Sequence, residues 1–315
     1  MTRYLGGRLL AAAIVLFALS LLAFGMVRLI PGDPALNFVQ VDNPDPAVLE
    51  AIRQQLGLDR PWYTQYLEWI GGAVTGDFGS SLTRPQQIGE QLAVRFPVSL
   101  QLAVMAMLIA VAFGVPLGVM AAVRPGKAVD AVVRGLSFVS LAVPAFIIAT
   151  VIILVNTSTV RLRLLGHVSF EDDPLGSIGS MLAPAIVLSL AMGAMIARYT
   201  RGTVIDALSQ DYIRTARAKG ASVGRIVVRH ALRNALIPVT TIIGVQLAAI
   251  IGGTVIIETV FAIPGMGSYL IESINTTDYP AIQACVLVLG AVFIIINLVV
   301  DLIYPLIDPR IRVAR

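Results

Sequence analysis

"YIRTARAKGASVGRIVVRHALRNALIP", from Tyr212 to Pro238, is a basic, helix-like stretch between two long apolar runs. The chain around it has 315 residues, 57% hydrophobic and 13% charged, which is about half the charge of a typical soluble domain. Its mean hydropathy is +0.84. Low charge combined with long apolar runs indicates a protein whose solvent is lipid. A basic stretch in such a chain needs an explanation beyond that of a simple loop.

Apolar runs predict an all-α polytopic membrane protein with six transmembrane helices. Each run is near the length of about 20 residues that a helix needs to cross the hydrocarbon. Strands of a barrel would be shorter and would alternate polar with apolar residues. The runs are Leu9–Ile30, Ser99–Val123, Ala131–Asn156, Ser180–Ala197, Leu236–Phe261 and Ala281–Tyr304. We expect Pro116, Pro144 and Pro184 to be tolerated kinks inside them, and the pair Gly114 and Gly118 to mark close helix packing.

Basic residues predict the orientation. With the N-terminus inside, the segment from Arg198 to Arg233 carries eight basic residues, whereas the outer loop after the third run carries only Arg161 and Arg163. The positive-inside rule then places both termini in the cytoplasm. The chain divides into a first transmembrane helix (1–30), an external subdomain (31–97), a five-helix core (98–308) containing the basic loop (198–235), and a cytoplasmic tail (309–315).

The external segment has helix signals of its own. Asp45, Pro46 and Gly57 would begin and end one helix, and Pro61 and Gly71–Gly72 would begin and end a second. These helices would form a small subdomain that packs on the bundle, a docking surface for an external partner, or both.

Two short helical pieces are predicted within the basic stretch. Asp211 would cap a piece from Tyr212 to Lys219, which Gly220 would end. Ser222 would cap a second piece that ends near Leu232. This second piece has an apolar face and a basic face: Ile226, Val227, Ala231 and Leu232 on the first, and Arg225, Arg229 and Arg233 on the second.

Two interpretations of the basic stretch compete. A basic amphipathic helix can lie on anionic lipid. Alternatively, the stretch is a rigid helical knuckle that inserts into a groove of a cytoplasmic protein, since it offers apolar anchors together with charges for the rim. Arg214, Arg217 and Lys219 would pair with lipid phosphates in the first case and with acidic residues of the partner in the second.

Two motifs resemble the cytoplasmic loop of permease subunits of binding-protein-dependent ABC importers. They are "TARAKGA" at Thr215–Ala221 and "HALRNALIP" at His230–Pro238. The family's loop is written E-A-A-x-x-x-G, followed further on by I-x-L-P. Ala216, Gly220 and Leu232 match this pattern, Arg214, Thr215 and Arg233 replace its glutamate, first alanine and proline, and the proline comes later, at Pro238. This variant is similar to the dipeptide/oligopeptide/nickel branch.

Further stretches resemble that branch in order along nearly the whole chain; only the segment from Asn156 to Ile178 has no counterpart. They are "RLIPGDPA" (Arg28–Ala35), "LGLDRPWYTQYLEWI" (Leu56–Ile70), "GDFGSSL" (Gly76–Leu82), "ETVFAIPGMG" (Glu258–Gly267) and "DLIYPLIDPRIR" (Asp301–Arg312).

The resemblance implies a type I ABC importer permease (MetI-like) fold in the bacterial plasma (inner) membrane. It implies a second homologous permease subunit, two ABC ATPase subunits or one fused ATPase, and an external substrate-binding protein that delivers peptide. ATP and Mg would be used by the ATPases, with no cofactor bound by this chain. Relatives carry dipeptides, oligopeptides, nickel chelates, haem or glutathione, and the cargo stays open.

The resemblance also assigns roles to residues. The ATPase-coupling loop would be formed by Arg214, Thr215, Ala216, Arg217, Lys219, Gly220 and Ala221. It would be supported by Asp211, Arg229, His230, Leu232, Arg233, Asn234 and Pro238. An external gate or mouth would be formed near Glu258, Pro264, Gly265 and Gly267, where Glu258 is alternatively a structural cap or hydrogen-bond partner and the glycines permit a tight turn. Asp301 and Asp308, near the other end of the sixth run, fit local ion pairs better than a proton relay.

Several other classes are excluded or disfavoured. No G-x-x-x-x-G-K-[ST] loop is present, so the chain lacks the usual means of hydrolysing ATP. One cysteine and two distant histidines, His167 and His230, allow no metal cluster of the usual spacing, and offer no Ser–His pair for an intramembrane protease. Dispersed basic residues without aromatic partners do not suggest nucleic acid. A stand-alone ion-coupled secondary transporter or channel remains the alternative.

Overall fold

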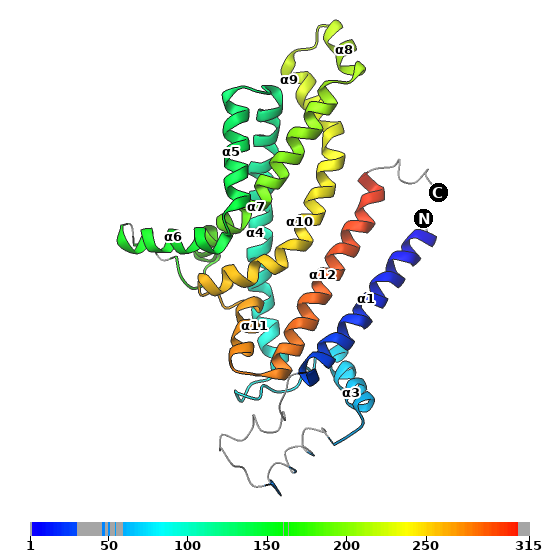
Figure 1. Ribbon diagram of the computed structural model, residues 1–315, viewed down its shortest axis with the longest axis vertical. Coiled ribbons are helices and arrows are strands. Elements are labelled where there is room, and N and C mark those ends of the chain that lie inside the picture. Colours follow the sequence, from blue (N-terminus) through cyan, green and yellow to red (C-terminus); the bar gives the residue numbers. More distant parts are fainter. Residues whose placement is uncertain are drawn as a thin grey trace. The chain divides into compact units, whose positions relative to one another are not determined.

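The computed structural model describes residues 2–29, 46–47, 50, 54, 59–159, 161–162 and 164–307, and every named element within these ranges is a helix (Figure 1). The elements are α1 (Thr2–Leu29), α3 (Trp62–Thr75), α4 (Ile88–Val123), α5 (Ala128–Ala142), α6 (Ala145–Ser158), α7 (Pro174–Leu208), α8 (Asp211–Ala218), α9 (Val223–Arg225), the π-helix η2 (Ile226–Leu232), α10 (Arg233–Val260), α11 (Met266–Asn275) and α12 (Tyr279–Ile307). The expectation of an all-α protein is confirmed.

Five helices among the described residues are long and apolar enough to cross a membrane, and a sixth span arises if the pair α5 and α6 is counted as one. The five lie in α1, α4, α7, the continuous stretch α9–α10, and α12. Helix α7 extends past both ends of the predicted run Ser180–Ala197. It starts earlier because Asp173 caps it by accepting from the N–H of Gly176 (3.0 Å).

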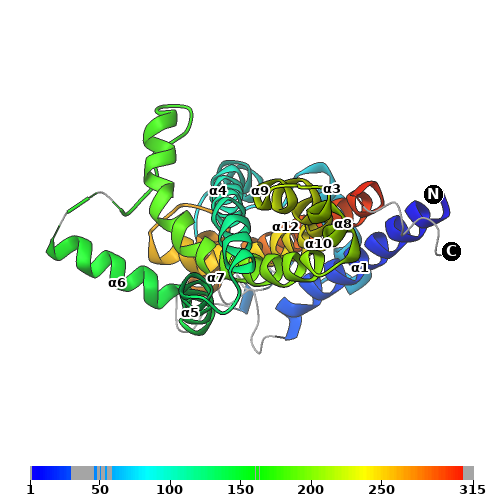
Figure 2. The same cartoon turned by 90° about the horizontal axis from the view of Figure 1, so that it is seen from above.

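The third predicted span is broken rather than kinked, so the expectation for Pro144 was wrong. Helices α5 and α6 are bent by 96° at this point, and Figures 1 and 2 show α6 turned away from the axis of α5. Val143 is extended (φ −92°, ψ 121°) because the following proline ring disfavours a helical conformation there. Pro116 and Pro184, by contrast, lie inside the unbroken helices α4 and α7, as predicted.

The chain folds into two compact units. Among the described residues, one contains Leu100–Ile263 and Ile296–Ile307, and the other contains those of Thr2–Ser99 together with Pro264–Ile295. Helices α4 and α12 therefore each contribute one part to each unit.

Helix α4 packs closely on α7 in the first unit. A Cβ atom added at Gly114 would lie 2.8 Å from the carbonyl oxygen of Gly193, and one added at Gly118 would lie 2.6 Å from Cβ of Thr200. Such distances are shorter than real Cβ contacts, so only glycine lets the two helix backbones approach this closely. The packing role predicted for these two glycines is confirmed.

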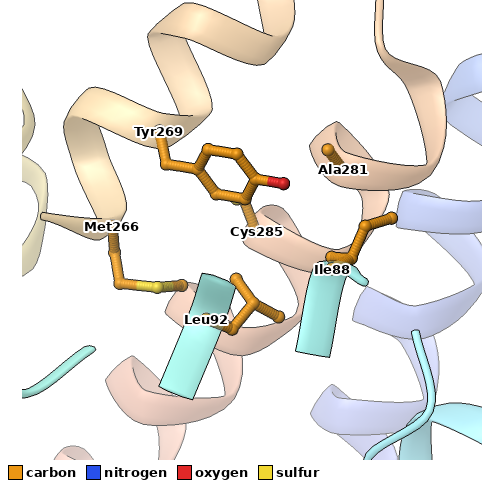
Figure 3. Packing of buried hydrophobic residues seen from close by; sticks show 7 residues of the cluster. Ile88, Leu92, Met266, Tyr269, Ala281 and Cys285 are labelled. Carbon is orange, nitrogen blue, oxygen red and sulfur yellow. The ribbon is translucent and has the colours of Figure 1, made fainter. Parts of the chain in front are cut away.

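A small apolar core joins α4, α11 and α12 in the second unit. Figure 3 shows Ile88 and Leu92 of α4 beside Met266 and Tyr269 of α11 and Cys285 of α12, all of them buried. The guanidinium of Arg95, another α4 residue, lies 4.7 Å from the centre of the Tyr269 ring. Burial raises the pKa of Tyr269 to about 12, so this hydroxyl stays protonated.

In the same unit, α3 packs on α1 through aromatic rings. The ring of Tyr66 lies 5.5 Å from that of Phe24 between centroids, and the Tyr66 hydroxyl lies 2.7 Å from Oγ of Ser20. The ring of Trp69 lies 5.8 Å from that of Phe24. The segment that follows the first span thus has an apolar anchor on that span.

Helix α3 ends later than the glycine pair suggested. It continues through Gly71–Gly72 and ends at Gly76, whose φ of +87° favours glycine. The helix predicted from Asp45 to Gly57 falls largely outside the described residues. Asp308, the tail 309–315 and most of the motif at Arg28–Ala35 lie outside them as well.

Candidate functional site

The basic stretch begins with α8, and its first residue is not the predicted cap. Gln210 is the N-cap residue, and no side chain makes a capping hydrogen bond there. Asp211 is the first helical residue, where its negative charge still complements the positive end of the helix. Its exposed carboxylate also lies 3.5 Å from the guanidinium of Arg214, one turn along the helix.

Helix α8 ends in a Schellman motif centred on Gly220. The N–H of Gly220 donates to the carbonyl of Arg217 (2.9 Å), and the N–H of Ala221 donates to the carbonyl of Ala216 (3.1 Å). Gly220 has φ +80°, a conformation that costs little only for glycine. The predicted end of the helix is confirmed, and Ala216 and Gly220, which match the family motif, take part in this turn.

The apolar side of α8 is covered by the chain itself. Ile213 is buried with Ala207 of α7 and with Ile226 and Ala231 of η2, and Ala216 packs against this cluster. Ala221 also packs there, so both ends of the Schellman turn are held against the same core. A helix that lies in a membrane surface keeps its apolar face free for lipid, and α8 does not.

The second predicted piece is not a separate helix. Ser222 occupies the N-cap position without a side-chain hydrogen bond, and α9 runs through η2 directly into α10. The apolar face is as predicted, since Ile226, Val227 and Ala231 are buried. The π-helical hydrogen bonding of η2 was not predicted; segments of this type often occur at functional sites.

Two contacts join the start of α10 to its neighbours. The side-chain amide of Asn234 donates to the hydroxyl of Tyr212 (3.0 Å), which ties α8 to α10. Leu232 packs against a buried cluster of Ala122, Val204 and Ala235 from α4, α7 and α10. Because α7 runs to Leu208, the connector between helices is also shorter than the predicted loop 198–235.

We define residues 209–233 as the knuckle. Its outward side is basic and carries a few exposed apolar side chains. Arg214, Arg217, Lys219, Arg225, Arg229 and Arg233 are exposed. Tyr212, Val223 and Val228 are exposed between them. Thr215 is also exposed and donates its hydroxyl to the carbonyl of Asp211 (3.2 Å), while His230 is half-buried. Pro238 lies within α10. Such a surface is complementary to an acidic groove with apolar pockets.

The residues assigned to an external mouth lie around the end of α10. Glu258 is fully buried, and its carbonyl accepts from the N–H of Ile263 (2.8 Å). The turn uses Ala262 at φ +53°, whereas Gly265 has an ordinary φ of −99°. The expectation that the glycines provide the bend was therefore wrong.

Gly267 lies buried in the first turn of α11, after Pro264. The unmatched segment between α6 and α7 meets the same α10 turn, because the N–H of Gly166 donates to the carbonyl of Phe261 (2.9 Å).

Sequence reasoning missed an ion pair in the first unit. Asp130 of α5 is buried and accepts two hydrogen bonds from Arg201 of α7, a residue that the sequence had placed in the cytoplasmic connector. The only sequence signal was a single acid next to the turn after the second predicted span.

Comparison with known proteins identifies the family. Residues 114–313 match the model described as "Binding-protein-dependent transport system inner membrane component", and residues 1–103 match its N-terminal counterpart. The chain belongs to this family. It is a type I ABC importer permease of the dipeptide/oligopeptide branch, a multi-pass membrane subunit that leaves ATP hydrolysis to separate subunits. Such a permease works with a partner permease, an ATPase and a substrate-binding protein.

The curated relatives are similar along their whole length. The glutathione transport system permease protein GsiC of Escherichia coli (strain K12) is 40% identical over 312 residues, covering 99% of each chain. The proteins of the same name from Shigella dysenteriae serotype 1 (40%) and Shigella boydii serotype 4 (39%) match over the same length.

Proposed function

We propose that this permease imports glutathione or short peptides and forms the translocation pathway with a second, homologous permease. The support is the similarity over 99% of the chain to relatives whose name is "Glutathione transport system permease protein". In this proposal both termini lie in the cytoplasm, residues 31–97 lie outside, and the core 98–308 carries the pathway. Glu258, Pro264, Gly265 and Gly267 surround its external mouth.

The knuckle is the proposed docking element for the ATPase subunits, two separate chains or one fused chain. The observation that carries this proposal is the use of the apolar side of α8 within the chain, which leaves an exposed surface of six basic side chains on a firmly held turn. Docking on acidic protein surface suits these charges, and the Schellman turn gives the knuckle the rigidity needed to transmit a push.

A substitution at Gly220 tests the docking role. Its Cβ would meet open space, so Gly220→Val acts through the backbone alone: valine at φ +80° is strained, and the turn must rearrange. Gly135→Val is the matched control, because Gly135 lies in α5 outside the knuckle, also faces open space and has no such φ. We expect Gly220→Val to assemble at least partly but to lose the stimulation of ATP hydrolysis by loaded binding protein, with Gly135→Val close to wild type. Normal stimulation in Gly220→Val contradicts the proposal.

Uptake by proteoliposomes tests the cargo and the energy source. The complete importer should take up labelled glutathione or a dipeptide only when ATP and the binding protein are supplied. Uptake by this chain alone, driven by an ion gradient without ATP, would favour the secondary-transporter alternative.

A further inference from the structure

An ion pair between a buried carboxylate and a partly buried guanidinium links α5 to α7 near the knuckle end of the first unit. The side chain of Asp130 is 1% exposed, and its two carboxylate oxygens accept from Nε (2.6 Å) and Nη2 (2.9 Å) of Arg201. The N–H of Gly126, in the turn between α4 and α5, donates to the same carboxylate (2.8 Å). One carboxylate thus joins the α4–α5 hairpin turn, α5 and α7.

This ion pair fixes both the separation of α5 and α7 and the orientation of one helix relative to the other. A guanidinium that meets a carboxylate through two parallel hydrogen bonds allows little rotation or sliding of either partner. A buried pair adds little net stability compared with well-packed apolar residues of similar volume. Its geometric constraint is therefore the property that an apolar contact at the same place would not supply.

Apolar packing continues from the pair to the knuckle. Val204 lies less than one turn after Arg201 on α7 and is buried against Ala122 of α4 and Ala235 of α10. Ala207, at the end of α7, is buried against Ile213 of α8. A displacement of α8 is therefore passed to the end of α7, where the ion pair holds the α4–α5 hairpin.

We propose that Asp130 and Arg201 are positioning residues that make the α4–α5 hairpin and the inner part of α7 move as one body when the knuckle is displaced. This inference rests on the proposed docking of an ATPase at the knuckle. Without the pair, the apolar packing of α4 and α5 on α7 would remain, but rotation and sliding of α5 along α7 would no longer be restrained.

Spin labels on the assembled importer in lipid test this directly. Labels at Val132 of α5 and Asp206 of α7 report the movement of one helix against the other; both positions are exposed and lie outside the ion pair and the knuckle. The single cysteine of the chain, Cys285, is buried and does not compete for the label. The distance is measured without nucleotide and with ATP and vanadate, in the presence of the binding protein.

In the parent protein we expect the same distance distribution without nucleotide and with ATP and vanadate. In Asp130→Asn the distribution should shift or broaden when ATP and vanadate are added. Arg201→Lys keeps the charge and loses the two-point contact, so it should behave like Asp130→Asn. Arg134→Gln is the control, because Arg134 is 57% exposed and its Nε lies 3.5 Å from the carboxylate. Unchanged distributions in Asp130→Asn and Arg201→Lys overturn the proposal.

Transport gives the functional measurement. Glutathione taken up per ATP hydrolysed should fall about fivefold or more in Asp130→Asn and Arg201→Lys, the lower end of typical coupling between linked sites. A purely structural role would reduce the amount of assembled complex but leave this ratio unchanged. Failure of the ATPase to bind the parent permease at the knuckle would overturn the proposed function, whereas normal docking with a normal ratio in both variants overturns only this inference.

Discussion

Asp130 and Asp278 are both buried carboxylates, one in each compact unit, and they are satisfied in different ways. Asp130 meets a guanidinium and one backbone N–H. Asp278, at the junction of α11 and α12, accepts from the hydroxyls of Ser81 and Thr83 and from the N–H of Leu82 (3.2 Å). The first joins helices through opposite charges, and the second ties a loop to a helix junction through neutral donors.

The difference separates two tasks. A charged two-point contact restricts the movement of one helix against another, whereas hydroxyl and amide donors satisfy a carboxylate while following small shifts of a loop. The loop around Ser81 has a second tie, since Arg84 forms an ion pair with Glu272 of α11. We therefore expect substitutions at Asp130 to be the more damaging ones.

Replacing Asp130 by alanine should lower thermal stability more than any substitution at Asp278, Ser81 or Arg134. It removes the carboxylate that accepts two hydrogen bonds from Arg201 and leaves that guanidinium partly buried without its counter-charge. Unfolding of the purified chain in detergent, followed by fluorescence, measures the effect. A smaller loss than that of Asp278→Asn would contradict the comparison.

Asp278→Asn should destabilise the protein by about 1–3 kcal/mol. The new side-chain NH₂ is a donor facing other donors, so some hydrogen bonds from Ser81, Leu82 and Thr83 lose their acceptor. Ser81→Ala, which removes one donor and keeps the carboxylate, should cost less, about 1 kcal/mol. Thermal unfolding of the two variants side by side measures the difference. Equal stability of Asp278→Asn and the parent chain would show that the loop is not held by this carboxylate.

Thr277→Gly should stabilise the junction next to Asp278 by about 1 kcal/mol, since Thr277 sits at φ +55°, where a β-branched residue is strained. The neighbouring Thr276 has an ordinary φ of −97°, so the same change there should bring no gain. If Thr276→Gly raised the thermal midpoint as much as Thr277→Gly, relief of backbone strain would not be the cause.

Arg134→Gln should change stability by no more than about 0.5 kcal/mol, because exposed ion pairs contribute little. The same unfolding measurement serves for this variant. A loss comparable to that of Asp130→Ala would mean that Arg134, rather than Arg201, is the main partner of the carboxylate.

The sequence predicted those features that local chemistry determines. The end of α8 at Gly220 follows from a glycine after a helical pattern, and the close approach at Gly114 and Gly118 follows from small residues one turn apart. The knuckle was also found from the sequence, since its charges interrupt an otherwise apolar chain.

Features that depend on tertiary contacts were not predictable. Asp130 and Arg201 are separated by 71 positions, and no local pattern indicates which arginine a buried aspartate will meet. The 96° break at Pro144 and the π-helical η2 depend on how neighbouring helices pack. At the end of α10, turn chemistry predicts glycine at the left-handed position. The chain instead places Ala262 there, at φ +53°, and the nearby glycines have other roles.

Photocrosslinking from the knuckle tests the central claim most directly. A photoreactive residue in place of the exposed Arg217, introduced into the complete importer in membrane vesicles, should crosslink to the ATPase subunit. The same residue in place of Val245, an exposed position within the α10 span, should crosslink to lipid. Crosslinks from Arg217 to lipid alone would contradict the account.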